Sequence, residues 1–279
     1  MPSGMKAAFW FSTNREDSSQ LRILMIGDIV GRPGRRAILD NLSYIRGELN
    51  LDFVIANGEN AAGGHGITRE IARELFAAGI DVFTMGNHVW NKKEIFEYIQ
   101  KEKRILRPAN YPPGTPGSGY NFFNVGAGPT LAIINISGRV FMQELDCPFR
   151  KVDEILKEID NKTKIIFVDF HAEATSEKVA MGWYLDGRVS AICGTHTHVQ
   201  TADERILPKG SAYITDVGMT GPRDSVIGVE TEIVLEKFVT QLPRRFEVAD
   251  TNYQLNAVMV EVDESTGRAL EIERIFNLE

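Results

Sequence analysis

The stretch Leu21-Arg-Ile-Leu-Met-Ile-Gly-Asp28 decides the fold of this chain. Its first six residues form a short, mostly apolar run, which is typical of a strand buried on both faces of a sheet. The run stops at Gly27, so Asp28 is placed at the carboxyl end of the strand. The stretch therefore predicts a buried strand that delivers a carboxylate to the edge of a sheet.

The same arrangement of an apolar run followed by polar residues recurs along the chain. Phe53–Ala56 is followed by Asn57-Gly-Glu-Asn60, Ile80–Met85 by Gly86-Asn-His88, and Lys164–Asp169 by Phe170-His-Ala-Glu173. Helical patterns separate the runs, over about residues 31–49, 68–78, 92–101, 151–160 and 176–185. This alternation predicts βαβ units and a mainly parallel sheet, whose ligands bind outside the carboxyl ends of the strands.

The two ends of the chain differ from this middle part. Ala257–Val262 and Ala269–Ile275 alternate between apolar and polar residues around a short turn, which predicts an antiparallel pair. Residues 1–20 lack a helical or strand period and are predicted to be a mobile extension or a remnant of cloning, outside the fold. No repeat or linker interrupts residues 21–279, so they are predicted to form a single domain.

The composition narrows the class of protein. Of the 279 residues 43% are hydrophobic, which is ample for a large core, and 31 Lys and Arg against 38 Asp and Glu give a net charge of −7. The negative net charge therefore disfavours binding of extended nucleic acid. It is compatible with a small anionic ligand and with a homo-oligomer. Cys147 and Cys193 form no CxxC pair, and no apolar stretch reaches the ~20 residues of a membrane span. A cytoplasmic protein without membrane association is expected.

Two of the five histidines lie in Gly194-Thr-His-Thr-His198, at the end of the apolar run Val189–Cys193. In an extended segment, residues i and i+2 project from the same face. We therefore expect His196 and His198 to reach one site together, as ligands to two neighbouring metals or to one.

The polar residues at the strand ends form a set of candidate metal ligands. In chain order they are Asp28, Glu59, Asn60, Asn87, His88, His171, His196 and His198. Carboxylates combined with imidazoles, without a thiolate, favour Fe or Mn, with Zn as a further candidate, over Mg or Ca. The set exceeds the four ligands of a tetrahedral zinc site and suits two ions about 3.5–4 Å apart. Two divalent ions with only two carboxylate ligands keep a net positive charge, which favours binding of a phosphate.

These motifs resemble those of the calcineurin-type metallophosphoesterases, over nearly the whole chain from residue 21 onward. The resemblance implies an α/β fold, a layered sandwich of two mixed β-sheets flanked by helices. Two features depart from the usual pattern: Asp28 is followed by Ile29-Val30 where Asp-x-His is common, and Glu59 stands where the bridging residue is usually aspartate. Both features resemble the bacterial YmdB-like branch, whose members act on cyclic nucleotides.

The resemblance also implies roles for individual residues. The first metal would be held by Asp28, Glu59, Asn60 and His198, and the second by Glu59, Asn87, His171 and His196. His88 would face the scissile phosphate as a catalytic residue, where it donates a proton or stabilises charge, while a metal-bridging hydroxide attacks in line. The implied function is hydrolysis of small cyclic nucleotides, in particular 2′,3′-cyclic ones, by a dinuclear metal-dependent phosphodiesterase.

Some alternatives stay open at this point. The same metals would serve a phosphomonoesterase or protein phosphatase, and a regulator could bind nucleotide or metal without turnover. His65 in the glycine-rich loop either contacts substrate or is an exposed loop side chain, and Glu173 either supports the substrate and metal site or is solvated. The segment Thr215–Gly221 either lines the pocket or simply turns.

Overall fold

The computed structural model describes residues 19–278. Most of the predicted extension, residues 1–18, lies outside the described residues. The first strand, β1 (Gln20–Ile26), begins one residue before the predicted boundary, and Ser19 accepts a backbone hydrogen bond from Glu264.

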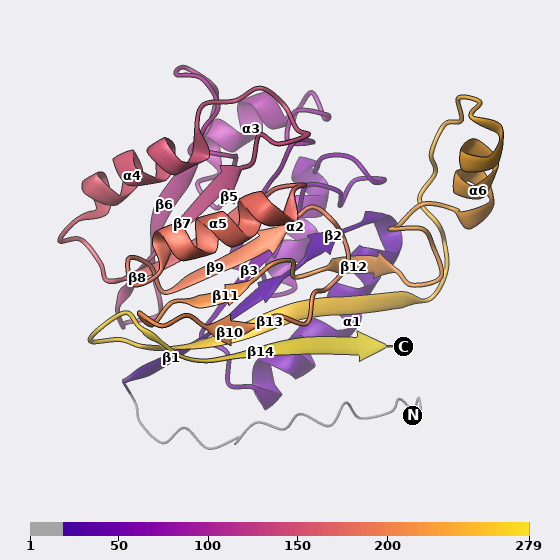
Figure 1. Ribbon diagram of the computed structural model, residues 1–279. Helices are drawn as coiled ribbons and strands as arrows, with labels where there is room; N and C mark the ends of the chain where they lie inside the picture. Colours follow the sequence, from indigo (N-terminus) through magenta and orange to yellow (C-terminus); the bar gives the residue numbers. More distant parts are fainter. Residues whose placement is uncertain (1–18, 279) are drawn as a thin grey trace.

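Two mixed β-sheets form the centre of the molecule (Figure 1). The first sheet has the order β2 (Asp28–Ile29), β12 (Met219–Pro222), β13 (Tyr253–Asp263), β1, β3 (Phe53–Asn57), β4 (Val82–Thr84) and β5 (Ile105–Leu106), with β14 (Ala269–Leu278) also paired to β13. The second has the order β10 (Arg205–Ile206), β11 (Ala212–Ile214), β9 (Ala191–Thr195), β8 (Ile165–His171), β7 (Thr130–Ser137) and β6 (Tyr120–Asn124).

The predicted parallel pairing of the βαβ strands and the antiparallel pair near the C-terminus are confirmed, although the parallel strands belong to two mixed sheets rather than to one. β1 pairs parallel with β3, and β3 with β4, as expected of βαβ units. β13 and β14 form the predicted antiparallel pair, and β13 also pairs antiparallel with β1. Each sheet is therefore mixed, because antiparallel strands join its parallel set.

Helices cover the outer faces of the sandwich. α1 (Gly31–Glu48), α2 (Arg69–Ala77) and α3 (Ile95–Lys101) follow strands of the first sheet, whereas α4 (Pro148–Ile159) and α5 (Thr175–Leu185) follow strands of the second. Thr68 accepts a hydrogen bond from Ile71 N at 3.3 Å and so caps α2 as its sequence predicts.

The alternation of side chains along β1 explains the layers. Leu24 and Ile26 belong to the core beneath α1, whereas Ile23 and Met25 belong to the core between the sheets. A third core lies between the second sheet and its helices α4 and α5. Because both faces of β1 are buried, its sequence is a continuous apolar run. The predicted layered sandwich is confirmed.

One helix was not predicted. α6 (Thr231–Thr240) projects from the sandwich (Figure 1), on an arm that comprises residues 227–248. Backbone hydrogen bonds at its root, from Glu230 N to Glu247 O at 3.0 Å and from Ala249 N to Gly228 O at 3.0 Å, tie the two ends of the arm together. Phe238 and Val239 on α6 are exposed. The helix therefore lacks the apolar stripe on one face by which the other helices were predicted.

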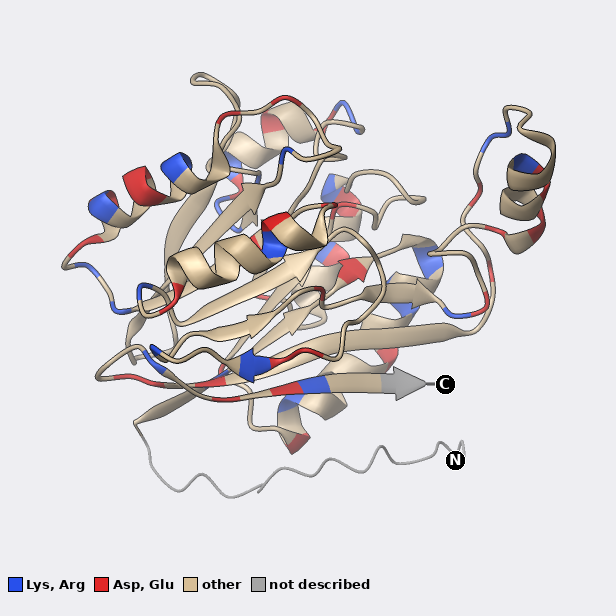
Figure 2. Cartoon of the chain, in the orientation of Figure 1, with Lys and Arg blue, Asp and Glu red and all other residues tan. Residues whose placement is uncertain are grey.

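Charged residues of both signs are interspersed along the helices coloured in Figure 2, in keeping with the balance of the composition. Within residues 19–278, no helix is both long enough and apolar enough to cross a bilayer.

Candidate metal centre

The predicted site residues come together at the carboxyl ends of the strands of both sheets. A pocket of about 410 Å³ opens there, lined among others by Glu59, Asn60, His88, His196 and His198. Glu59 and Asn60 follow β3, and His196 follows β9, so the pocket joins the two sheets. The expected position of a ligand, outside the carboxyl ends of parallel strands, is thus where these side chains meet.

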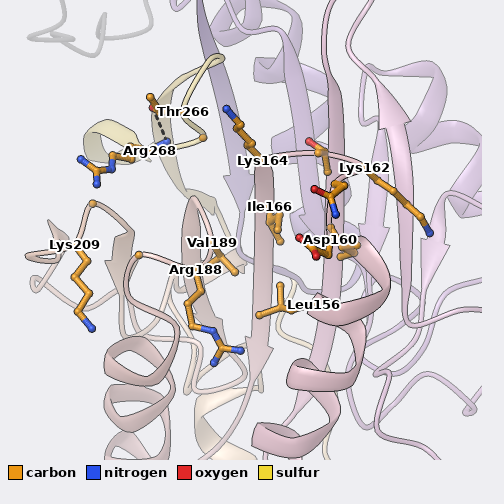
Figure 3. Close-up of a pocket in the computed structure, with 16 residues that line it drawn as sticks. Leu156, Asp160, Lys162, Lys164, Ile166, Arg188, Val189, Lys209, Thr266 and Arg268 are labelled. Carbon is orange, nitrogen blue, oxygen red and sulfur yellow. Dashed lines mark hydrogen bonds between the residues drawn. The ribbon is translucent and has the colours of Figure 1, made fainter.

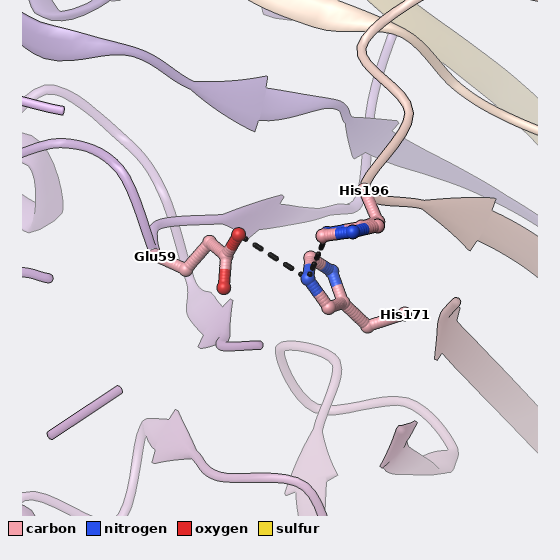
Figure 4. A group of neighbouring side chains, drawn as sticks. All are labelled: Glu59, His171 and His196. Atoms are coloured by element: carbon pink, nitrogen blue, oxygen red, sulfur yellow. Dashed lines mark hydrogen bonds and ion pairs between the residues drawn. The ribbon is translucent and has the colours of Figure 1, made fainter. Parts of the chain in front are cut away.

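Glu59 lies at the centre of one group of contacts. His171 Nε2 lies 3.2 Å from Glu59 Oε1, 3.1 Å from Asn87 Oδ1 and 3.0 Å from His196 Nδ1. Ligand atoms of Glu59, His171 and His196 all lie within 4.8 Å of one another (Figure 4). A Cβ at Gly86 would lie 2.1 Å from His171 Nε2, so the approach of Asn87 to this group requires glycine before it.

A second group of contacts shares Glu59. Asn60 Nδ2 donates to Glu59 Oε1 at 3.1 Å and lies 3.2 Å from His198 Nε2, which in turn lies 3.9 Å from Asp28 Oδ1. Asp28 is the first residue of β2 and is fully buried. Glu59 is thus common to both groups of contacts, and Asp28 Oδ1, which lies 4.0 Å from His171 Nδ1, also joins them.

The geometry of the histidine pair differs from the prediction. β9 ends at Thr195, and His196 and His198 have φ values of 99° and 66°, in the left-handed region. They therefore do not reach the site as i and i+2 of an extended segment, and the expectation of an extended backbone there is wrong. A hydrogen bond from His196 N to Asp28 Oδ2 at 3.1 Å holds the turn against the site instead. Non-glycine residues in this region are uncommon and cluster at functional sites.

The donor set fits a bound cation. Asp28 Oδ1 is buried and has no hydrogen-bond partner among the described residues. Burial raises the pKa of Asp28 to about 6, whereas for Glu59 the effect of burial is outweighed by the charge and hydrogen bond of His171, which lower its pKa. Burial would lower the pKa of His171, but Glu59 raises it to about 9. These opposed pKa shifts show that the buried carboxylates and imidazoles stabilise one another by holding protons between them. A metal ion can replace such protons, because the same oxygen and nitrogen atoms are its ligands.

His88 lies beside this cluster and is held by Asn60. Asn60 Oδ1 accepts a hydrogen bond from His88 Nδ1 at 2.7 Å, since the amide nitrogen of Asn60 is directed to Glu59 and His198. This contact fixes the proton on Nδ1 and leaves Nε2 as the ring atom available to a ligand. Burial lowers the pKa of His88, and the charge of Glu59 opposes the effect.

The two other predicted residues also line the pocket. The ring of His65 packs edge-on against that of His88, with centroids 4.7 Å apart. Glu173 Oε2 lies 3.2 Å from His196 Nε2, and the Glu173 side chain is half-exposed. His65 thus contacts His88, and Glu173 contacts one candidate ligand.

Sequence reasoning missed a set of buried residues behind His171. Thr195 Oγ1 lies 2.9 Å from His171 Nδ1 and donates to Asp169 Oδ1 at 2.7 Å. Asn57 Nδ2 donates to the other oxygen of Asp169 at 3.2 Å. These contacts orient the ring so that Nε2 faces Glu59. Their signal in the sequence is that Asn57 and Asp169 are polar residues at the ends of apolar runs.

A second missed contact supports the turn that carries His196 and His198, which we call the histidine turn. Lys178 on α5 donates to Asp216 Oδ2 at 2.6 Å, and both side chains are buried. The same oxygen accepts from Thr197 N at 3.0 Å and from Thr197 Oγ1 at 2.7 Å. Thr197 lies between the two histidines, so this ion pair fixes the turn that carries both. The segment Thr215–Gly221 therefore supports the candidate site through Asp216. This role differs from both alternatives expected from the sequence, lining the pocket or forming a turn.

A larger hollow, of about 740 Å³, lies elsewhere, at the amino ends of β8 and β9 (Figure 3). It is bordered by exposed cations, among them Lys164, Arg188 and Lys209, and by none of the predicted site residues. Size alone therefore does not single out a candidate site; the convergence of buried ligand-type side chains does.

The helix-flanked sandwich of two mixed sheets, with carboxylate, amide and imidazole groups gathered at its strand ends, defines a metallophosphoesterase-type protein. Solved structures agree: a phosphatase from Mycoplasma pneumoniae, 37% identical, superposes with a TM-score of 0.89 over 93% of this chain and 94% of its own. A Thermus thermophilus protein described as hypothetical, 46% identical, superposes with a TM-score of 0.87 over 93% of this chain and all of its own.

Within this class the chain belongs to the YmdB-like protein family, whose sequence model matches residues 24–275. A 2′,3′-cyclic-nucleotide 2′-phosphodiesterase of Bacillus subtilis is 52% identical over 92% of this chain and 97% of its own length. A putative phosphatase/phosphodiesterase of Mycoplasma genitalium is 39% identical over 91% and 92%, respectively. The family relationship expected from the motifs is confirmed.

Proposed function

We propose that this protein is a metal-dependent phosphodiesterase that hydrolyses small cyclic nucleotides, in particular 2′,3′-cyclic ones, with a dinuclear metal centre. The observation that carries the proposal is the pair of side-chain groups that share the buried carboxylate Glu59. The similarity to the Bacillus subtilis enzyme, which extends over nearly the whole chain, supports the choice of substrate.

The two ions would be held by the side chains already described. Asp28, Glu59 and His198, with Asn60 beside them, would hold one ion, and Glu59, Asn87, His171 and His196 the other. Fe or Mn suits this mixture of oxygen and nitrogen ligands, with Zn as a further candidate. When bound, such ions supply activation of water and positive charge for the phosphate. As a ligand Asn60 would use Oδ1, the atom that here accepts from His88.

The chain's own residues would orient the substrate and exchange the proton. His88 is positioned by Asn60 with Nε2 available, so it is the residue proposed to meet the leaving oxygen of the scissile phosphate. Glu173 would restrain the ring of His196, and Asp169 that of His171 through Thr195. Glu173 and Asp169 would thus act on the position of a candidate ligand, whereas His88 would act at the phosphate itself.

An assay of the protein loaded in turn with Mn, Fe and Zn tests this proposal. We expect turnover of bis-p-nitrophenyl phosphate and of 2′,3′-cyclic nucleotides, abolished by a chelator and restored when the metal is returned. Metal analysis should find two ions per chain. Absence of chelator-sensitive turnover with all three metals would refute the proposed activity.

Replacing His88 by alanine should separate catalysis from metal binding. We expect the rate on a cyclic nucleotide to fall by about 10²–10⁴-fold while the metal content stays at the wild-type value, because loss of a proton-transfer group slows the reaction to that extent. His65→Ala, which removes only a ring contact of His88, should cost less than about tenfold and serves as the matched control. Loss of metal from the His88 variant would contradict its role as a non-ligand.

A monoesterase activity is a second candidate, because both Mycoplasma relatives are described with phosphatase activity in their names. Parallel assays on nucleoside monophosphates and on cyclic nucleotides distinguish the two. A higher kcat/KM on the monoesters would favour the phosphatase.

A further inference from the structure

The pocket at the candidate metal centre has two chemically different sides. One side carries the candidate ligands and His88. The other is apolar and comes almost entirely from the arm, as Ile227, Val229, Phe246 and Val248. The proposed function uses the first side only, so the apolar side calls for a separate explanation.

The apolar side is fixed relative to the candidate ligands. Ile227 O accepts a hydrogen bond from His198 Nδ1 at 2.8 Å, which joins the beginning of the arm to a candidate ligand. Val229 and Val248 form a β-bridge across the root of the arm. A Cβ at Gly64, whose φ is +86°, would lie 2.7 Å from Val248 Cγ2, so the glycine-rich loop closes tightly against the arm.

Phe246 is the one aromatic side chain among the described residues that line this pocket, apart from its histidines. Its side chain is 40% exposed, and it stands two residues before Val248, which is half-buried at the root of the arm. The ammonium group of Lys237 lies 4.3 Å from the centroid of its ring, which restrains the ring from the side of α6. An exposed, restrained ring that borders a pocket is suited to stack on a flat ligand group.

From this arrangement we infer that Phe246 is a substrate-binding residue, the platform on which the base of the nucleotide stacks while its phosphate lies at the metal centre. The inference rests on the proposed function, which requires a ligand with a phosphate at one end and an aromatic base at the other. A volume of about 410 Å³ lies within the usual range of small-molecule sites. Stacking is tolerant of base identity because every base has an aromatic face.

Phe246→Ala tests the inference. We expect KM for 2′,3′-cyclic AMP and 2′,3′-cyclic CMP to rise by about tenfold with little change in kcat, in line with the loss of one base–aromatic contact. Phe246→Trp should restore the wild-type KM. Hydrolysis of glycerol 1,2-cyclic phosphate, which has no base, should be the same in the Phe246→Ala variant and the wild type.

Phe238→Ala is the matched control, because Phe238 is also an exposed phenylalanine of the arm but does not line the pocket. It should leave all these constants unchanged. Calorimetric titration with 3′-AMP gives a readout independent of turnover: Phe246→Ala should weaken its binding about tenfold, and Phe238→Ala should not.

The outcomes separate the two ideas. An unchanged KM and unchanged 3′-AMP binding in Phe246→Ala would overturn the stacking role while the phosphodiesterase stands. An equal loss on glycerol 1,2-cyclic phosphate would also overturn it, since the substitution would then act on the metal side. Failure of the wild type to hydrolyse any diester would instead refute the proposed function, and the titration would still test the base contact.

Discussion

Glu59→Gln is expected to lower kcat/KM on cyclic nucleotides by more than about 10³-fold and to reduce the bound metal below two ions per chain. Glu59 contacts both groups of candidate ligands, through His171 on one side and Asn60 on the other. Two ions on a phosphate supply several kcal/mol of charge stabilisation, which corresponds to a loss of this size. Glutamine keeps the shape of the side chain but removes the charge.

Measurements of metal content and of steady-state rates on the same preparations check this expectation. Glu173→Gln is the informative comparison, because it makes the same change at a half-exposed carboxylate that contacts His196. It should cost about 10–100-fold, as is common for residues that orient a ligand. Glu70→Gln, at an exposed residue of α2 that does not line the pocket, should have no effect. Retention of two ions and of more than a tenth of the rate in Glu59→Gln would exclude a bridging role.

Lys178→Met should give the largest loss of stability. The substitution leaves the buried carboxylate of Asp216 without its cation, and breaking a buried ion pair in this way costs about 3–5 kcal/mol. It should also loosen Thr197 and with it the turn that carries His196 and His198. We therefore expect a lower free energy of unfolding in urea and weaker retention of metal during dialysis.

The matched control for Lys178→Met is Lys151→Met, which breaks an exposed Lys–Glu pair of similar length on α4. Exposed pairs contribute about 0–1 kcal/mol, so this variant should unfold close to the wild type. Comparable losses for the two variants would show that burial of the Lys178–Asp216 pair has no special effect. If the Lys178 variant is destabilised but keeps all of its metal, the Lys178–Asp216 ion pair supports the fold but not the turn that carries His196 and His198.

The sequence by itself determined most of the strands and helices of this protein and the identity of its candidate ligands, whereas the sandwich of two sheets was expected only from the family resemblance. A strand such as β1, buried on both faces, has to be apolar throughout, and a helix that covers a sheet has to be apolar on one face, so both leave local patterns. Asp28, Glu59 and His171 could be singled out because each interrupts or ends such a pattern. The parallel arrangement of the strands then placed them at one edge.

The tertiary structure alone decided how those residues are held. The histidine turn has a left-handed backbone rather than an extended one, and it is stabilised by Lys178 and Asp216, which are 38 residues apart in the chain. Phe246 reaches the pocket from an arm whose apolar side chains are largely exposed and so give no amphipathic signal. Contacts between residues distant in sequence produce no local period, so only the folded chain reveals them.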